Sequence, residues 1–365
     1  MAIGIDVRKY YDFGIGTYIQ HLIGEYAKMQ TSHHFLLFAG PEDAKTVDIP
    51  AGWRTFVVPY GKYSFGEIAL FGHRINASDV SVFHSPHYTL PFGLKCKSIV
   101  TIHDLIHLRF PQYFSLLQRS YSYGMIWHAT RDARFIITDT EFTKHDILQS
   151  FRVKEEKIIP IPLGVSEQFH SKPTHSQLED FKLKFKVEYP FILFVGNSKP
   201  HKGVSILLHA FKEVLASFPD INLVFVGGPL SSDKTFHELM NNLGISKKVR
   251  SLGRISNEDL ILAYNSAEMF VLPSLYEGFG LPALEAMASG TPVVVSNAGS
   301  LPEIVGNAAI VCESGNHGMF ADAMMNLHRN PALKEEMIKK GKERSRSFSW
   351  QVTAKKTLEV YDKTF

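Results

Sequence analysis

Short apolar runs alternate with longer amphipathic segments along most of the chain. The runs are rich in Val, Ile and Phe and lack the polar alternation of a half-exposed strand, so they predict parallel strands buried on both faces. Helical patterns between them, such as 17–29 and 142–151, complete a series of β/α units. The fold class is therefore α/β, with two sheets in series. The predicted strands are 2–7, 35–39, 55–59, 80–84, 98–103, 134–139 and 157–162, then 191–196, 222–227, 250–254, 268–273, 292–296 and 308–312.

The alternation breaks at 162–177, where Pro, Ser and His accumulate. We interpret this stretch as a linker between two domains, although the same composition would suit one long surface loop. The first domain is then 1–168 and the second 169–348. Apolar residues recur at helical spacing in 349–365, which predicts a helix that crosses back to the first domain. Two such domains facing each other are expected to form a cleft at the carboxyl ends of their strands, where ligands bind.

Composition excludes several classes of protein. With 365 residues, 45% hydrophobic residues and a formal net charge of +3, the chain is globular and has no strongly basic surface for nucleic acid. Its two cysteines, Cys96 and Cys312, are too few for a disulfide framework, which favours the cytoplasm. The N-terminus lacks the pattern of a signal peptide, and no run approaches the roughly 18 apolar residues of a membrane span. Any membrane contact is expected to be peripheral.

The stretch EGFGLPALE, residues 277–285, places a carboxylate at each end of a glycine-containing loop. A helix is predicted to begin near Leu281, so backbone N–H groups and the positive end of a helix dipole lie there. The glycines allow a ligand to approach the backbone closely. Carboxylates accept hydrogen bonds, so Glu277 and Glu285 suit the hydroxyls of a hexose and of a ribose. The alternative is a carboxylate that stabilises the helix start and a second one in solvent.

Two further loops carry candidate ligand contacts. In FVGNSKPHKG, Lys199 and Lys202 oppose the preference of a helix start for acidic residues, so a ligand such as a diphosphate is expected to supply the anion. Solvated lysines are the simpler alternative. In DFGIGTY, Gly14 and Gly16 resemble part of a dinucleotide fingerprint whose third glycine is absent. This loop is either a helix start near a ligand or a plain tight turn.

His103 and Asp104 stand at the end of a predicted strand, where a side chain can face the cleft. A structural or solvated histidine is equally consistent with the sequence. No set of His and Cys has the spacing of a zinc site, and neither a nucleophile elbow nor a Walker sequence is present. We therefore expect no bound metal and no cofactor.

Together these stretches resemble the retaining family 4 glycosyltransferases of the GT-B fold, over nearly the whole chain. The resemblance is carried by GIGTY, by HDL at 103, by VGNSKPHKG at 195, and by LGRISNEDLILAYNSAEMFVLPSLYEGFGLPALEAMASGTPVVVSN at 252–297. It implies two Rossmann-like domains, with acceptor binding in the first and nucleotide-sugar binding in the second.

The resemblance also implies roles for individual residues. The family residue matching Glu277 binds hydroxyls of the transferred sugar, and the one matching Glu285 binds the ribose. The lysine matching Lys202 neutralises the diphosphate, and the histidine matching His103 lies near the donor sugar. The implied catalytic residues are His103, Glu277 and Lys202. The implied donor-binding residues are Gly14, Gly16, Asn197, Lys199, Lys202, Gly227, Arg254, Ile255, Glu277, Gly278, Phe279, Gly280, Leu281 and Glu285.

One position departs from the family. Asn197 stands where many members have an arginine that helps to hold the diphosphate. Asparagine donates hydrogen bonds but carries no charge, so either Lys199 or Arg254 compensates or the leaving group is held less strongly.

The implied reaction breaks the anomeric bond of the donor, while Lys202 and helix-terminal amides stabilise the departing diphosphate without a metal ion. Attack on the face of departure retains the anomeric configuration, and the leaving phosphate takes the acceptor proton. The sequence leaves Asp104 and Asp139 open as carboxylate nucleophiles.

The sequence of 274–303 and of FHSPHYTLP at 83–91 is most similar to bacterial mannosyltransferases that build cell-surface polysaccharides. GDP-mannose is therefore the expected donor, and a glycan or lipid-linked molecule the expected acceptor. UDP-glucose and UDP-N-acetylglucosamine are alternative donors. The alternative from another class is a non-catalytic scaffold that binds a nucleotide sugar; an epimerase, a phosphorylase and a nicotinamide dehydrogenase have less support.

Residues 110–135 mix aromatic residues with Arg119, Arg131 and Arg134. This segment could contact the inner face of a membrane or line an acceptor groove. A helix packed partly inside its own domain is the favoured interpretation.

Overall fold

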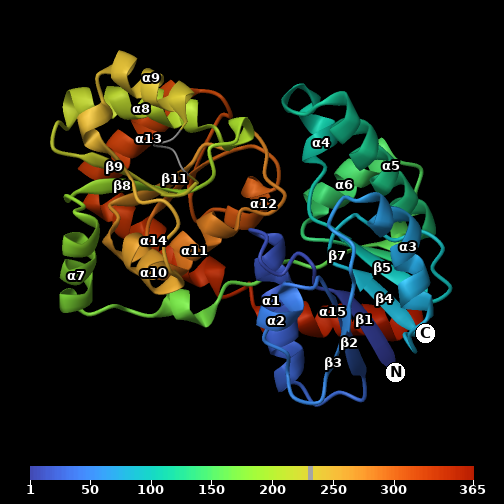
Figure 1. Ribbon diagram of the computed structural model, residues 1–365. Coiled ribbons are helices and arrows are strands. Elements are labelled where there is room, and N and C mark those ends of the chain that lie inside the picture. Colours follow the sequence, from blue (N-terminus) through green and yellow to red (C-terminus); the bar gives the residue numbers. More distant parts are fainter. Residues whose placement is uncertain (229–232) are drawn as a thin grey trace. The chain divides into compact units, whose positions relative to one another are not determined.

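The computed structural model describes residues 1–228 and 233–365 and consists of two compact units (Figure 1). Unit 1 comprises Met1–Gly164 and Ser349–Phe365, and unit 2 comprises Val165–Phe348. Each unit is built around one parallel sheet, with seven strands in unit 1 and six in unit 2. The prediction of an α/β fold with two Rossmann-like sheets is therefore confirmed.

Unit 1 has the strand order β3-β2-β1-β4-β5-β6-β7. The order reverses between β1 and β4, which is the topological switch point of such a sheet. Its strands are β1 (Ala2–Asp6), β2 (His34–Ala39), β3 (Arg54–Val57), β4 (Val82–Ser85), β5 (Lys97–Ile102), β6 (Phe135–Thr138) and β7 (Ile158–Pro160). Its helices are α1 (Ile15–Lys28), α2 (Asp43–Thr46), α3 (Phe65–Asn76), α4 (Ile106–Arg109), α5 (Leu116–Asp132), α6 (Glu141–Ser150) and α15 (Trp350–Thr364), with short 3-10 helices at Pro111–Tyr113 and Glu155–Lys157.

Unit 2 has the strand order β10-β9-β8-β11-β12-β13. Its switch point lies between β8 and β11. Its strands are β8 (Phe191–Gly196), β9 (Asn222–Gly227), β10 (Val249–Ser251), β11 (Met269–Leu272), β12 (Val293–Ser296) and β13 (Ile310–Cys312). Its helices are α7 (His175–Phe185), α8 (Val204–Ser217), α9 (Lys234–Leu243), α10 (Asn257–Ser266), α11 (Leu281–Ser289), α12 (Leu301–Val305), α13 (His317–Arg329) and α14 (Pro331–Ser345), with 3-10 helices at Glu167–His170, Pro200–Lys202 and Ser246–Lys248.

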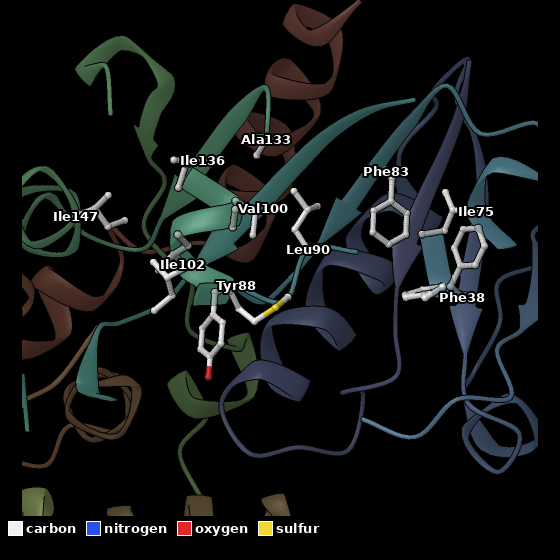
Figure 2. Packing of buried hydrophobic residues seen from close by; sticks show 14 of the residues in the cluster. Phe38, Ile75, Phe83, Tyr88, Leu90, Val100, Ile102, Ala133, Ile136 and Ile147 are labelled. Atoms are coloured by element: carbon white, nitrogen blue, oxygen red, sulfur yellow. The ribbon is translucent and has the colours of Figure 1, made fainter. Parts of the chain in front are cut away.

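Aromatic and aliphatic side chains fill the space between the sheet of unit 1 and its helices (Figure 2). Phe38, Phe71 and Phe83 are fully buried and meet edge to face, with ring centroids 5.6–5.8 Å apart. Burial of one such side chain contributes roughly 2–3 kcal/mol, so this cluster is a main source of the stability of unit 1. The continuous apolar runs of the sequence are explained by strands that are covered on both faces.

The segment expected to be a linker is largely folded onto unit 2. Phe169, in the 3-10 helix Glu167–His170, is buried and packs edge to face on Tyr264 at 5.9 Å. The C-terminal helix α15 belongs to unit 1, as expected, where it packs against α1. His21 of α1 stacks on Trp350 of α15 with ring centroids 4.5 Å apart.

No helix within the described residues is both long and apolar enough to cross a membrane.

Candidate functional site

Polar loops follow neighbouring strands of unit 2. Strands β9, β8 and β11 are adjacent in the sheet, and the strand order reverses between β8 and β11. Because parallel strands bring their carboxyl ends to one edge, the loops carrying Asn197, Lys202 and Glu277 lie at the same edge. Sheets of this kind bind ligands outside this edge at the point of reversal.

Lys202 and Glu277 join the loops after β8 and β11 directly. Nζ of Lys202 donates a hydrogen bond to Oε1 of Glu277 at 2.7 Å, and the hydroxyl of Ser274 donates to the same oxygen at 2.7 Å. The two charged side chains are only 18% and 9% exposed. The sequence predicts that a ligand supplies the anion beside Lys202, but in the structure Glu277 of the chain itself supplies one. The two residues are 75 positions apart, so only the fold reveals the pair.

Two glycines are required for this arrangement. Gly203 has a φ of +68°, and a Cβ there would lie 2.0 Å from the carbonyl oxygen of Pro273. Gly299 has a φ of +61°, and a Cβ there would lie 2.4 Å from the carbonyl oxygen of Glu277. That carbonyl also accepts hydrogen bonds from the N–H and the hydroxyl of Ser300, at 3.0 and 3.1 Å. The loop after β12 therefore fixes the backbone of Glu277.

Glu285 lies in the second turn of α11. The hydroxyl of Tyr264, in α10, donates a hydrogen bond to Oε2 of Glu285 at 2.9 Å. Burial raises the pKa of Glu285 to about 7, although the hydrogen bond from Tyr264 acts in the opposite direction. This carboxyl group therefore holds a proton more tightly than an ordinary glutamate and is held in one orientation by Tyr264.

The loop before α11 is shaped by glycine. Leu281 is the first residue of the helix, and Gly280 precedes it with a φ of +94°, a conformation that glycine adopts without strain. The ring of Phe279 is buried and packs edge to face on Phe348 at 5.9 Å. Because this ring is buried, we expect Phe279 to contact a ligand through its backbone, as we do for Gly278, Gly280 and Leu281. The helix start provides N–H groups and a positive dipole end for an anion.

Asn197 shapes the loop after β8. Its side-chain oxygen accepts a hydrogen bond from the N–H of Lys199 at 3.1 Å, and the Lys199 side chain is exposed. The side-chain amide is the group with which Asn197 can donate to a ligand, and it carries no charge.

Gly227 is the last residue of β9, and Arg254 and Ile255 follow β10, at the same edge of the sheet. Gly227 has a φ of +119°, and a Cβ there would lie 2.4 Å from the carbonyl oxygen of Gly196. The need for glycine at 227 is therefore explained by the chain itself. Arg254 is exposed and Ile255 is half-buried.

His103 belongs to unit 1 and follows β5. Its Nδ1 lies 2.7 Å from Oδ2 of Asp139, and its Nε2 lies 3.1 Å from the carbonyl oxygen of Pro86. Burial alone would lower the pKa of His103, but Asp139 and the Pro86 carbonyl outweigh it and raise that pKa. Because both partners are acceptors, the fold favours an imidazolium that donates from both nitrogens. Asp139 is buried and held by His103, which leaves it poorly placed as a nucleophile.

Gly14 and Gly16 lie at the start of α1 in unit 1. A Cβ on Gly16 would lie 2.4 Å from the carbonyl oxygen of Tyr10, so the tight turn of the chain explains this glycine. Gly14 is exposed, and a Cβ there would meet no atom within 4 Å.

The structure thus brings Lys202 and Glu277 into contact and places Glu285 in the helix that follows Glu277. Sequence reasoning missed Ser274, Tyr264 and Ser300, which hold the two glutamates. Only Ser274, three residues before Glu277, is close enough in sequence to have been found. Within residues 1–228 and 233–365, no three or more His, Cys, Asp or Glu side chains are grouped so that they could hold a metal ion.

Two family models match this chain. The model described as "Glycosyltransferase Family 4" matches residues 14–169, and the model described as "Glycosyl transferases group 1" matches residues 176–344. The first lies in unit 1 except for its last residues, and the second lies within unit 2.

Similar curated proteins include two mannosyltransferases. O-antigen chain mannosyltransferase B of Escherichia coli is 28% identical over 77% of this chain and 74% of its own length. The MMP alpha-(1->4)-mannosyltransferase of Mycolicibacterium hassiacum is 35% identical over 66% of this chain, and the match spans only 57% of that relative's length.

Solved structures with similar folds cover the whole chain. Sucrose-phosphate synthase from Thermosynechococcus elongatus has a TM-score of 0.81 at 22% identity, covering 100% of this chain and 98% of that one. Anabaena Alr3699/HepE, in complex with UDP and glucose, has a TM-score of 0.80 at 17% identity and covers 99% of both chains. At these identities the likeness concerns the fold.

Proposed function

Because the chain belongs to the family 4 glycosyltransferases and has their GT-B fold, we propose that it transfers mannose from GDP-mannose to a glycan or lipid-linked acceptor in cell-surface polysaccharide synthesis. The similarity to two mannosyltransferases supports this donor sugar. The observation that carries the proposal is the pair of Lys202 and Glu277 beside the start of α11, because it combines a cation for a diphosphate with a carboxylate for sugar hydroxyls.

The donor is proposed to bind at the carboxyl edge of the sheet in unit 2. Lys202 and the N–H groups at the start of α11 would hold the diphosphate. Glu277 would accept hydrogen bonds from hydroxyls of the sugar, and Glu285 from the ribose. Both Lys202 and Ser274 donate to Oε1 of Glu277, so Oε2 is the oxygen we assign to the sugar.

These groups must stabilise the negative charge that develops during the reaction. When the bond between the anomeric carbon and the phosphate oxygen breaks, negative charge accumulates on the departing diphosphate. Preorganised donors lower the free energy of that state, and Lys202 with the helix start is proposed to supply them without a metal ion. The acceptor oxygen forms its bond to the same face of the anomeric carbon, and the leaving phosphate oxygen takes the acceptor proton. The anomeric configuration is then retained.

His103 of unit 1 is proposed to contribute to transfer through the positive charge of its ring, because both of its N–H groups already donate to Asp139 and to the carbonyl of Pro86. Its two nitrogens face acceptors, so it does not serve as a general base in this conformation. The free thiols of Cys96 and Cys312 support a reducing compartment, and we propose the cytoplasm.

A UDP-sugar is the second candidate donor, because the structurally similar Anabaena protein carries UDP and glucose. A transfer assay with GDP-mannose, UDP-glucose and UDP-N-acetylglucosamine, run with a panel of glycan and lipid-linked acceptors in EDTA, separates the candidates. We expect GDP release from GDP-mannose that depends on acceptor and yields an α-linked product by NMR. If the protein turns over a UDP-sugar but not GDP-mannose, the second candidate is the donor. Binding without turnover across the panel would indicate a non-catalytic scaffold.

A further inference from the structure

Helix α5 of unit 1 has two apolar faces. Met125, Ile126 and Ala129 are buried in the core of the unit. Leu116, Tyr123 and Trp127 are 75%, 51% and 47% exposed. Steps of seven and four residues keep these three on one side of a helix, away from the buried side. The favoured prediction of a helix packed partly inside its own domain is therefore confirmed.

Further apolar side chains extend this exposed stripe at the start of the helix. Leu117 is 84% exposed, and Tyr113, in the 3-10 helix just before α5, is 40% exposed. A single exposed leucine needs no explanation, but apolar side chains gathered along one helix indicate a surface that meets another apolar phase.

Basic side chains and hollows border the stripe. A hollow of about 630 Å³ is lined by Tyr123, Trp127, Arg131, Arg152 and Lys154, among others. A neighbouring hollow of about 370 Å³ includes Leu116, Arg119 and Tyr123 in its lining. A third, of about 800 Å³, includes Arg131, Arg134 and Lys154. Arg131 and Lys154 thus line two of the three hollows, and Arg119 lines the other one.

The acidic residues nearby are already engaged for the most part. Asp132 lies 2.9 Å from Nδ1 of His128 and 3.5 Å from Nε of Arg131. Glu155 is 2.9 Å from Nζ of Lys144, which leaves Glu156 as the remaining acid in this region. Asp132 offsets part of the charge of Arg131, but basic side chains still outnumber acidic ones around the stripe.

We propose that this face docks unit 1 onto an anionic phospholipid bilayer. Helix α5 would lie in the plane of the interface, with Leu116, Leu117, Tyr123 and Trp127 at the boundary of headgroups and acyl chains. Tyr and Trp are enriched at that depth because one part of each ring system is polar. Arg119, Arg131, Arg134, Arg152 and Lys154 would contact lipid phosphates in the rim and its hollows.

Charge decides between the possible occupants of the face. A second copy of this chain, paired through the same stripe by a two-fold axis, would bring its basic rim against the identical basic rim. A bilayer that contains anionic lipid instead supplies the opposite charge around an apolar interior. The membrane is therefore the occupant that satisfies both parts of the surface.

Co-sedimentation with vesicles tests the proposal. We expect binding to vesicles of phosphatidylcholine mixed with phosphatidylglycerol, little binding to phosphatidylcholine alone, and weaker binding at high salt. A Leu117→Ser/Trp127→Ser variant and an Arg131→Glu/Lys154→Glu variant should each lose roughly tenfold or more in affinity. The matched controls are Leu183→Ser on α7, where the leucine is 73% exposed, and Lys355→Glu/Lys356→Glu on α15. Circular dichroism confirms that each variant is folded.

The fluorescence of Trp127 also reports directly on contact of this face with the bilayer. The chain has three tryptophans, of which Trp350 is buried and Trp53 is half-buried, whereas Trp127 is exposed. Anionic vesicles should shift the emission to shorter wavelength, and Trp127→Phe should abolish that shift while preserving the fold.

Three outcomes would overturn the proposal. The first is that the protein does not bind anionic vesicles. The second is that the stripe variants and the control variants lose the same amount of vesicle affinity. The third is that the stripe forms a dimer in buffer and this dimer does not bind vesicles. Vesicle binding does not depend on which sugar the enzyme transfers, so failure of one proposal leaves the other standing.

Discussion

Nζ of Lys202 lies 2.7 Å from Oε1 of Glu277, and the two side chains come from loops that follow adjacent strands at the switch point of unit 2. The pair is largely shielded from water, so each charge stabilises the other in place. A donor that inserts its diphosphate next to Lys202 and its hydroxyls next to Glu277 would find both groups already oriented.

Lys202→Ala is expected to lower kcat by roughly 100-fold or more, because loss of one preorganised donor to a developing anion has an effect of this size. Lys199→Ala is the control: that lysine is three residues earlier in the chain but exposed, and its loss should cost less than about tenfold. Steady-state kinetics with GDP-mannose would measure both. Full activity of Lys202→Ala and Glu285→Ala together with normal folding would refute the assignment of the donor site.

Gly299→Ala should destabilise the protein more than Gly244→Ala. Both glycines have positive φ, +61° and +71°. An alanine in this left-handed conformation therefore lowers the free energy of unfolding by about 1–2 kcal/mol in both variants. Only at Gly299 would the new Cβ overlap a neighbour, the backbone of Glu277 at 2.4 Å. That overlap should cost a further 1–3 kcal/mol, roughly, in the free energy of unfolding.

Donor affinity should fall in Gly299→Ala and stay normal in Gly244→Ala, because only the first displaces Glu277. Chemical denaturation and donor titration would measure the two effects. Equal losses of stability in the two variants would show that the contact of Gly299 with Glu277 is unimportant.

Glu285 should make stability depend on pH in a defined window. Its pKa rises from the usual 4.5 to about 7 in the folded chain, so the native state binds a proton more tightly than the unfolded state does. The free energy of unfolding of the wild type should therefore fall, relative to Glu285→Gln, as pH rises from about 4.5 to about 7, and the difference should then level off. Parallel denaturation curves at several pH values test this, and a constant difference would contradict it.

Asp139→Asn is expected to lower the pKa of His103. In the wild type burial lowers that pKa, but Asp139 together with the Pro86 carbonyl and Asp104 outweighs burial and raises it; with Asn the contribution of Asp139 is lost, so the pKa should fall. The raised pKa stabilises the native state below the unfolded pKa, and this contribution is lost as pH rises through the folded pKa. The variant should thus lose most stability at acidic pH. NMR titration of the His103 ring, assigned with His103→Gln, would detect the shift. An unchanged pKa in Asp139→Asn would show that Asp139 does not raise the pKa of His103.

The strands were predictable because each is a buried parallel strand with a continuous apolar run. Glu277 and Lys202 could be named as candidates because each follows a strand, and Glu285 because it stands in the helix that begins after the glycine-containing loop. Their mutual contacts could not be predicted. The bond from Lys202 to Glu277 joins residues 75 positions apart, and the hydroxyl of Tyr264 reaches Glu285 from another helix. Such partners depend on which strands become neighbours in the sheet, which local patterns do not encode. For 110–135 the sequence left a surface contact only as an alternative, because the two apolar faces of α5 cancel the periodicity that marks an amphipathic helix.

The central claim is that unit 2 binds the nucleoside diphosphate of a sugar donor through Lys202 without a metal ion. Calorimetric titration of GDP, UDP and ADP into the wild type and Lys202→Ala, all in EDTA, tests it most directly. The account predicts that GDP binds the wild type most tightly and that Lys202→Ala weakens this binding at least about tenfold, as expected for a charge-assisted hydrogen bond to phosphate. Failure of every nucleotide to bind the wild type, or equal binding to both proteins, would contradict it.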